Sequence, residues 1–389
     1  MILNFLSKPI SRPSVLALAI SSYVLSLAVL GRSIVTPLGL LSYGRVWQNH
    51  VSYLDIGFAR RSLWGTLLNL TGLNSVPANE YINAHFIHGF FLLALVFLAA
   101  KYLLKNKQNL TILHGFILLF SPAFVLHLAY STGTVDYVLS FMLFASCLYV
   151  RSFFVLGLIA SAGVLTHEAY LFFVPFIAIN NLCVTNSFGS SGIIRSMAKC
   201  LPLLLLPAIA ALSLKLFGAQ APSQASYELL MNSKLPLASG QHPLWSGYYE
   251  IFSTISDNQQ SLAKVFADIG SNFFYAIIPL TYVLVLASII TFSKSTMRSR
   301  LIPFYILTLF LPLGISLVAT DYLRWICMSG QLCLIALITL QAEGLLQARS
   351  ASLFWAVPFS LFAPFGVAEL SHPFPMHQFL LKKLLGRFS

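Results

Sequence analysis

The chain has 389 residues, of which 58% are apolar and only 9% are charged, with 23 Lys and Arg against 11 Asp and Glu. Soluble domains are about one quarter charged, so this composition excludes a soluble globular protein and predicts an all-α, polytopic transmembrane helical bundle. The net charge of +12 then reflects basic cytoplasmic loops and contact with anionic membrane lipids, and we expect no nucleic-acid partner.

Eleven apolar runs, each of about 15 to 24 residues, mark the predicted membrane spans. They lie near 14–31, 82–100, 110–129, 134–150, 152–166, 169–184, 200–217, 269–292, 301–319, 325–341 and 351–368. The first run is longer than the core of a signal peptide, so we expect an uncleaved anchor. No repeat or linker divides the chain, which predicts one transmembrane domain over residues 1–389.

The distribution of charge predicts the orientation. With the N-terminus in the cytoplasm, every predicted cytoplasmic loop is basic, as the positive-inside rule requires. The same arrangement places ten of the eleven acids outside, with Glu343 as the exception. We therefore expect the working face to be the outer one. The side of the C-terminus stays open, because eleven spans put it outside while Lys382, Lys383 and Arg387 favour the inside.

Two predicted outer segments, 32–81 and 218–268, are long enough to have structure of their own. The first contains Tyr53–Gly65, which we expect to form an amphipathic helix in the lipid headgroup layer. Its carboxylate, Asp55, can take a proton from a hydroxyl, and Arg60 and Arg61 can clamp a phosphate. The alternative is a surface helix whose arginines rest on headgroups. The second segment is rich in proline and aromatic residues and is expected to cover a binding site.

Other polar groups lie at the outer ends of predicted spans or in the long loop. They are Asp136, His167, Glu168, Asp321, Arg324 and, in segment 218–268, His242. Ionisable groups so close to hydrocarbon are costly, so function is the default hypothesis for them. Structural alternatives exist: Asp136 can cap a helix, His167 and Glu168 can mark a turn, and Asp321 can pair with Arg324 one turn later.

The sequence does not indicate a metal site or another cofactor. His167 and Glu168 are adjacent and point to different faces of any helix, and there is no Asp-x-Asp pair. A divalent ion shared by Asp55, Asp136 and Glu168 is the alternative to a cofactor-free site. The five cysteines form no Cys-x-x-Cys pair, which argues against both a disulfide framework and a zinc site.

This combination resembles the GT-C class of integral membrane glycosyltransferases, which have many spans, a first outer loop with an essential acid, and a long later loop. The counterpart of that acid is Asp55, in Tyr53-Leu-Asp-Ile-Gly-Phe-Ala-Arg-Arg-Ser-Leu. His167-Glu168 and Asp321-Tyr-Leu-Arg-Trp are similar to motifs in bacterial polytopic proteins of exopolysaccharide or O-antigen type. The paired acids that many GT-C members carry are absent beside Asp55.

The resemblance implies transfer of a sugar from a polyprenyl-phosphate-linked donor to a glycan or lipid-linked acceptor. Asp55 is then the general base, with Glu168 as an alternative base, while Arg60, Arg61 and Arg324 bind the departing phosphate. The further expected substrate contacts are Asp136, His167, His242 and Asp321. Three alternatives stay open: a polymerase that uses lipid-diphosphate oligosaccharides, a flippase for lipid-linked glycans, and a non-catalytic scaffold protein.

Overall fold

The structure is a computed structural model that describes residues 6–35, 46–75, 80–130, 134–185, 198–235, 245–252, 277, 279–295, 302–317 and 322–362. Most of these residues are helical, and the strands among them form one two-stranded antiparallel ribbon, β1 (Lys294–Ser295) with β2 (Leu346–Gln347). An all-α bundle is therefore what the described part of the chain forms.

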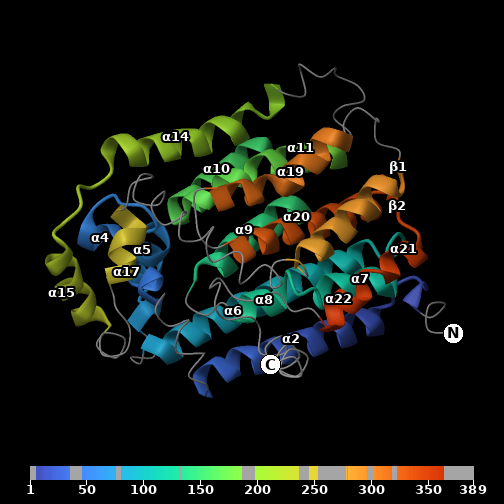
Figure 1. Ribbon diagram of the computed structural model, residues 1–389, viewed down its shortest axis with the longest axis horizontal. Coiled ribbons are helices and arrows are strands. Elements are labelled where there is room, and N and C mark those ends of the chain that lie inside the picture. The colour runs from blue at the N-terminus through green and yellow to red at the C-terminus, as the bar shows by residue number, and fades with distance from the viewer. Residues whose placement is uncertain are drawn as a thin grey trace, which may run out of the picture.

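Most helices run roughly along one common axis and are stacked from α2 on one side to α14 on the other (Figure 1). In chain order the bundle contains α2 (Arg12–Val35), α6 (Glu80–Lys105), α7 (Ile112–Leu119), α8 (Val125–Tyr130), α9 (Asp136–Tyr149), α10 (Phe153–Thr166), α11 (Val174–Val184), α14 (Leu201–Phe217), the helix Pro279–Phe292, α19 (Ile302–Phe310), α20 (Tyr322–Ala342), α21 (Ser350–Phe354) and α22 (Val357–Phe362). The 3-10 helix η3 (Glu168–Phe172) precedes α11, and η4 (Leu311–Leu317) follows α19.

Three of these helices are long and apolar enough to cross a membrane. They are Arg12–Gly31, Ile82–Lys105 and Arg324–Ala342. The third, in α20, is 94% buried and forms the centre of the bundle, whereas the first is only 28% buried. The exposed side of that first helix carries Leu16, Ile20 and Val24. Helices that present such apolar surfaces outward are suited to contact with lipid.

The inner edge of α14 packs closely on α10. A side chain at Gly157 of α10 would meet the backbone oxygen of Pro202 at 2.6 Å, so only glycine permits this approach of the two helices. Exposed apolar residues lie along the opposite side of α14 and include Leu205, Ile209 and Leu212. These two helices therefore form one packed layer with an apolar outer surface.

Contacts between connecting segments define one end of the bundle, here called the basic end. Asn109 Nδ2 donates to the carbonyl oxygen of Ala342 over 2.6 Å, and Arg151 pairs with Glu343 over 3.8 Å. The β1–β2 ribbon joins Lys294 to Gln347 at this end. Segments that the sequence assigns to the cytoplasmic side thus lie together.

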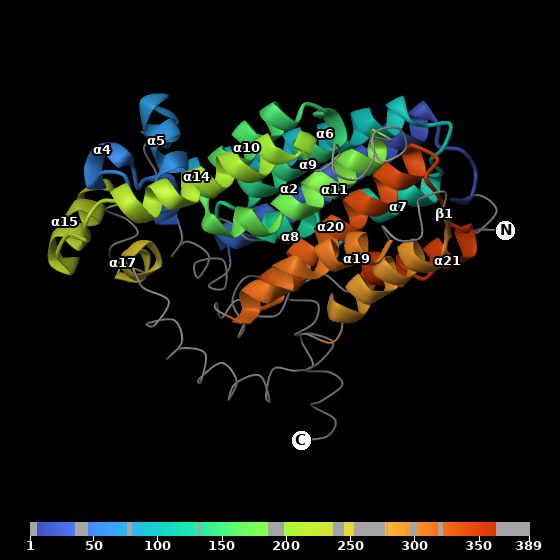
Figure 2. The ribbon, with the colours of Figure 1, turned by 90° about the horizontal axis from the view of Figure 1, so that it is seen from above.

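The other end carries a lobe with its own apolar core, here called the end lobe. It consists of η1 (Val46–Asn49), α4 (Tyr53–Ile56), α5 (Leu63–Leu70), α15 (Gln224–Lys234) and α17 (Trp245–Phe252). Figures 1 and 2 both place α4, α5, α15 and α17 together beyond the bundle. In its core, Trp47 and Val51 pack with Tyr227, Met231 and Ile251. The two predicted outer segments therefore fold against one another.

The prediction of one amphipathic helix over Tyr53–Gly65 is wrong. The chain forms α4, then leaves the helical path at Gly57, whose φ is 73°, and re-enters a helix only at Leu63. The backbone between the two helices hydrogen-bonds to the second outer segment, because the carbonyl oxygen of Phe58 accepts a hydrogen bond from Ala219 N over 2.7 Å. Glycine adopts a positive φ without the steric penalty of a Cβ atom, so it permits this exit from the helix.

Two predicted spans contain breaks. The run 110–129 is divided into α7 and α8, because Pro122 lacks an amide hydrogen and Ser121 Oγ instead accepts from Ala123 N over 3.1 Å. The run 351–368 contains α21 and α22 up to Phe362. Its remainder and the basic tail lie outside the described residues.

Candidate functional site

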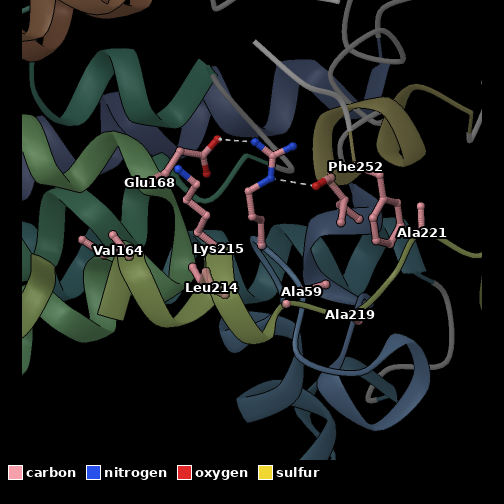
Figure 3. Close-up of a pocket in the computed structure, with 12 residues that line it drawn as sticks. Ala59, Val164, Glu168, Leu214, Lys215, Ala219, Ala221 and Phe252 are labelled. Atoms are coloured by element: carbon pink, nitrogen blue, oxygen red, sulfur yellow. Dashed lines mark hydrogen bonds and ion pairs between the residues drawn. The ribbon is translucent and has the colours of Figure 1, made fainter. Parts of the chain in front are cut away.

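A cavity of about 470 Å³ lies where α10, η3 and α14 meet the end lobe (Figure 3). Its lining residues are Ala59, Arg60, Val164, Glu168, Ala211, Leu214, Lys215, Gly218, Ala219, Ala221, Ile251 and Phe252. Figure 3 shows Glu168 and Lys215 on one side and Phe252 and Ala221 on the other. Most of these residues are apolar and several are small, so a few charged groups line an otherwise apolar space, as in typical ligand sites.

A two-pronged ion pair holds Glu168 in place. Arg61 Nη2 donates to Glu168 Oε1 over 2.8 Å, and Arg61 Nε donates to Oε2 over 3.3 Å. Burial alone raises the pKa of Glu168, but the adjacent Arg61 guanidinium outweighs this and holds the pKa well below its ordinary value of 4.5. Glu168 therefore stays ionised at neutral pH, with 36% of its side chain exposed.

The turn that presents Glu168 is organised by His167. This residue ends α10 in an extended conformation, and its Nδ1 accepts a hydrogen bond from Ala169 N over 3.2 Å. Because Nδ1 is the acceptor, the neutral ring carries its proton on Nε2. Burial lowers the pKa of His167 well below 6.5, so the imidazole is neutral. It therefore positions the start of η3 rather than pairing with the Glu168 carboxylate.

Arg60 lies between the bundle and the end lobe. Its Nε donates to the carbonyl oxygen of Ile251 in α17 over 2.7 Å, and its Nη1 lies 4.0 Å from Glu168 Oε1 (Figure 3). Its side chain is 33% exposed. The Arg60 guanidinium thus connects α17 of the end lobe to the carboxylate of Glu168 in the bundle.

The backbone at Arg61 is strained. Its φ is 62°, the left-handed region, where it is the sole residue other than glycine among those described. Any residue with a Cβ atom pays about 1 kcal/mol in that conformation, because the Cβ atom approaches the neighbouring carbonyl oxygen. The hydrogen bonds that this conformation permits offset the cost. It directs the Arg61 guanidinium onto Glu168, while the neighbouring Arg60 side chain donates to Ile251.

A second ion pair lies beside this site. Arg324 Nε donates to Asp136 Oδ1 over 3.0 Å, and a second guanidinium nitrogen contacts the same oxygen. Asp136 is 0% exposed and Arg324 is 3% exposed. The Arg324 guanidinium also lies 5.0 Å from the ring centroid of Trp325, whose indole is 6.5 Å from the His167 ring. The structure therefore brings Asp136, Arg324 and His167 together behind the cavity wall.

Asp136 is not the N-cap that the structural alternative requires. The N-cap position of α9 is Val135, and Asp136 is the first helical residue, where its charge faces the positive end of the helix dipole. The alternative partner of Arg324, Asp321, lies outside the described residues, as does His242.

Asp55 is not among the residues that line the cavity. Its carboxylate contacts the ammonium of Lys234 in α15, which also donates to the carbonyl oxygen of His50 over 3.3 Å. The Asp55 side chain is 18% exposed. This pair joins α4 to α15 and so links the two outer segments, and the role of Asp55 as a base stays a prediction.

Sequence reasoning missed two lysines. Lys215 lines the cavity from the last turn of α14, and Lys234 is the partner of Asp55. A signal for Lys215 was present, because a lysine near the outer end of an apolar run departs from the positive-inside rule. No signal identified Lys234, since its partner is 179 residues away.

Two further observations concern metals and thiols. Within the described ranges, no group of three His, Cys, Asp or Glu side chains is arranged to hold a metal ion. The five cysteines, Cys147, Cys183, Cys200, Cys327 and Cys333, are buried and unpaired, so the absence of Cys-x-x-Cys motifs agrees with their packing as apolar side chains.

Comparisons of this chain with protein-family models, with curated proteins and with solved structures find no match.

Proposed function

We propose that this protein is a membrane glycosyltransferase, which transfers a sugar from a polyprenyl-phosphate-linked donor to a glycan or lipid-linked acceptor. The observation that carries the proposal is the cavity at the lobe end of the bundle. It combines an ionised carboxylate, Glu168, with the guanidinium of Arg60 in an otherwise apolar space. Acid–base chemistry and phosphate binding are thus available at one place.

In the proposed reaction the acceptor hydroxyl attacks the anomeric carbon of the donor sugar. A bond forms between the acceptor oxygen and that carbon, and the bond from the carbon to the phosphate oxygen breaks. The leaving phosphate takes the electron pair, and the acceptor proton passes to Glu168. Arg60 stabilises the negative charge that develops on the phosphate, a contribution that is larger in the transition state than in the bound donor.

Glu168 is a better candidate for the base than Asp55. Glu168 lines the cavity, whereas the Asp55 carboxylate contacts Lys234. A carboxylate with a depressed pKa is a weak base, yet a hydroxyl becomes strongly acidic as its oxygen bonds to carbon, so proton transfer late in the reaction remains favourable. Arg61 then acts as a positioning residue, because its two hydrogen bonds orient Glu168.

The proposal includes the membrane arrangement expected from the sequence: eleven spans in a GT-C-like architecture, a cytoplasmic N-terminus and a periplasmic working face of a bacterial inner membrane. The division of the connecting segments between the basic end and the end lobe supports it. The bilayer then surrounds the apolar outer surfaces of α2, α6 and α14.

The location of the buried charges favours an enzyme over a flippase. Among the described residues, the buried Asp, Glu, Lys and Arg side chains are Glu80, Asp136 and Arg324. Each lies in the first turn of its helix, α6, α9 or α20, at the lobe end. A transporter is expected to carry such groups near mid-membrane depth, where coupling ions bind.

The test is release of undecaprenyl phosphate from a panel of undecaprenyl-phosphate-linked hexoses and pentoses by the full-length protein in proteoliposomes. Glu168→Gln is expected to lower turnover at least 100-fold, within the range for loss of a general base. The matched control is Glu343→Gln, which removes a carboxylate from an arginine pair at the basic end and is expected to leave turnover within about twofold of the unmodified protein.

Two results would contradict the proposal. One is full turnover by Glu168→Gln, which would remove this residue from the reaction. The other is no release from any donor of the panel with acceptor glycans present, in protein whose size-exclusion profile and melting temperature show that it is folded.

A further inference from the structure

We infer that Lys215 and Arg60 form a two-cation site for the phosphate of a membrane lipid, and that this site binds a doubly charged phosphomonoester in preference to a singly charged phosphodiester. The inference rests on the proposed function, because it adds a residue and a charge preference to the same cavity. It concerns binding, however, and is tested without sugar or acceptor.

The first step is the position of Lys215. This residue is in the last turn of α14 and lines the cavity together with Arg60 and Glu168. Figure 3 shows its amino end on the same side of the cavity as Glu168. Within the part of the chain that the structure describes, no ion pair joins the Lys215 ammonium to a carboxylate. Its charge is thus available to an anion in the cavity.

The second step is the balance of charge. The ionisable groups at the cavity are Arg60 and its neighbour Arg61, Lys215, and Glu168, with His167 beside them in its neutral form. Three cations against one carboxylate leave a surplus of two positive charges. A phosphodiester carries one negative charge, whereas a phosphomonoester carries close to two above its second pKa of about 6. The surplus therefore matches the phosphomonoester.

The third step is the source of the phosphate. Leu205, Ile209, Leu212 and Leu216 follow one another at helical spacing and form an exposed apolar stripe on α14. Lys215 lies on the helix between this stripe and the cavity-lining positions such as Ala211. A lipid whose phosphate contacts Lys215 can therefore place its hydrocarbon chain along the stripe, which a free phosphate cannot use.

The charge preference has a consequence for the proposed reaction. When the sugar leaves, the phosphate changes from a diester with one negative charge to a monoester with two. A site with two surplus positive charges stabilises the second state more than the first, so Lys215 contributes mainly as the transfer proceeds. Its loss is expected to lower kcat more than it raises KM for the donor.

The experiment measures binding of radiolabelled lipids to the full-length protein in nanodiscs at pH 8. The probes are a polyprenyl phosphate, its methyl phosphodiester, the uncharged polyprenol and inorganic phosphate. The unmodified protein is expected to bind polyprenyl phosphate about tenfold more tightly than the diester, which corresponds to about 1.4 kcal/mol. Polyprenol and inorganic phosphate are expected to bind at least 100-fold more weakly.

The variants assign the preference to one side chain. Lys215→Gln is expected to bind the two charged lipids equally, and Lys215→Arg is expected to retain the preference. The matched control is Lys199→Gln, which removes an exposed lysine just before the opposite end of α14 and is expected to behave as the unmodified protein.

Each contrary result has its own meaning. A preference unchanged in Lys215→Gln overturns the inference, and so does polyprenol that binds as tightly as its phosphate. Inorganic phosphate that competes at equal affinity overturns the lipid source. If lipid binding depends on Lys215 but no sugar is transferred, the glycosyltransferase proposal fails and this inference stands. If sugar is transferred but lipid binding does not depend on Lys215, this inference fails and the glycosyltransferase proposal stands.

Discussion

Asp136 and Arg324 form the most deeply buried ion pair among the described residues, with exposed fractions of 0% and 3%. Removing only the arginine takes the paired cation away from a carboxylate in a low-dielectric interior. We predict that Arg324→Gln destabilises the protein by about 3–5 kcal/mol. The measurement is the melting temperature of the purified protein in detergent, followed by the fluorescence of a thiol-reactive dye that labels the cysteines as they become exposed.

The double variant Asp136→Asn/Arg324→Gln tests the cause. Since it removes both charges, it is expected to be more stable than Arg324→Gln alone. A double variant with a melting temperature lower than that of Arg324→Gln would show that the Asp136 charge is not the cause of the destabilisation. Arg151→Gln serves as a control, because the Arg151–Glu343 pair is 34% and 37% exposed and surface pairs contribute at most about 1 kcal/mol.

Arg61 supports a prediction about acid stability. The pKa of Glu168 is lower in the folded protein than its ordinary value of 4.5, so this pair stabilises the fold above about pH 4.5 and loses its effect at more acidic pH. We predict that Arg61→Gln lowers stability at pH 7 by about 1 kcal/mol, a small value because Glu168 is 36% exposed.

The check on Arg61 is a pair of melting curves. The gap between the melting temperatures of the unmodified protein and Arg61→Gln is expected to be constant from pH 7 to about pH 5 and to narrow as the pH falls from there toward 3. A gap that stays constant over the whole range would mean that the variant acts through the backbone at residue 61 and not through the charge of Glu168.

At the level of residues, the sequence predicted the types of side chain better than their partners. Arg60 and Arg61 were expected beside Asp55, yet they contact Ile251 and Glu168, while Asp55 contacts Lys234. The reason is that partners 107 to 191 residues apart in the chain are set by how the outer segments fold together. Helical periodicity does not contain that information.

The turn between α10 and α11 depends on one glycine. A methyl group at Gly163 would meet the Tyr170 ring at 2.5 Å, and that ring is 0% exposed. We predict that Gly163→Ala displaces η3, lowers stability by about 1–3 kcal/mol and lowers turnover of the lipid-linked donor more than tenfold, because Glu168 begins η3. Melting temperature and release of undecaprenyl phosphate measure the two effects.

Gly31→Ala is the matched control for that prediction. Gly31 lies within α2 and has nothing within 4 Å of an added methyl group. Alanine is the better helix former, so this substitution is expected to be neutral or stabilising by up to about 1 kcal/mol. If both alanine variants behaved alike, the Tyr170 contact would not explain the role of Gly163.

Helices were predictable from the sequence where the length of an apolar run is enough to define them. The runs 14–31 and 82–100 correspond to α2 and α6, and 325–341 corresponds to α20. The breaks inside Tyr53–Gly65 and inside the run 110–129 were not predicted. Tyr53–Gly65 divides at Gly57 because the end lobe requires the backbone of Phe58 to pair with Ala219, and such a tertiary requirement overrides local helix propensity.

For the whole molecule, composition was enough to predict a helical bundle, because a chain with 9% charged residues can satisfy its backbone in lipid only through helices or closed barrels. The end lobe was not predicted. Its core joins side chains from segments far apart in the chain, such as Trp47 and Tyr227, which are 180 residues apart, and no local pattern in either segment specifies the other.

The two ends of the bundle give a prediction about sidedness. The native cysteines are buried, so a single introduced thiol reports its own position. Ser233 is exposed in α15, and Gln108 is exposed at the basic end. We predict that a membrane-impermeant maleimide labels Ser233→Cys in intact cells but labels Gln108→Cys only after lysis. The opposite pattern would invert the proposed orientation.

The cavity is shared by two packing units. Val164 and Leu214 in its wall belong to the layer of α10 and α14, whereas Ile251 in its roof belongs to the core of the end lobe. A ligand that contacts both units therefore links its binding equilibrium to the docking of the lobe. At a concentration 100 times its Kd, such a ligand opposes separation of the units by about 2.7 kcal/mol. By reciprocity, a substitution in the lobe core that loosens docking weakens ligand affinity without touching the ligand.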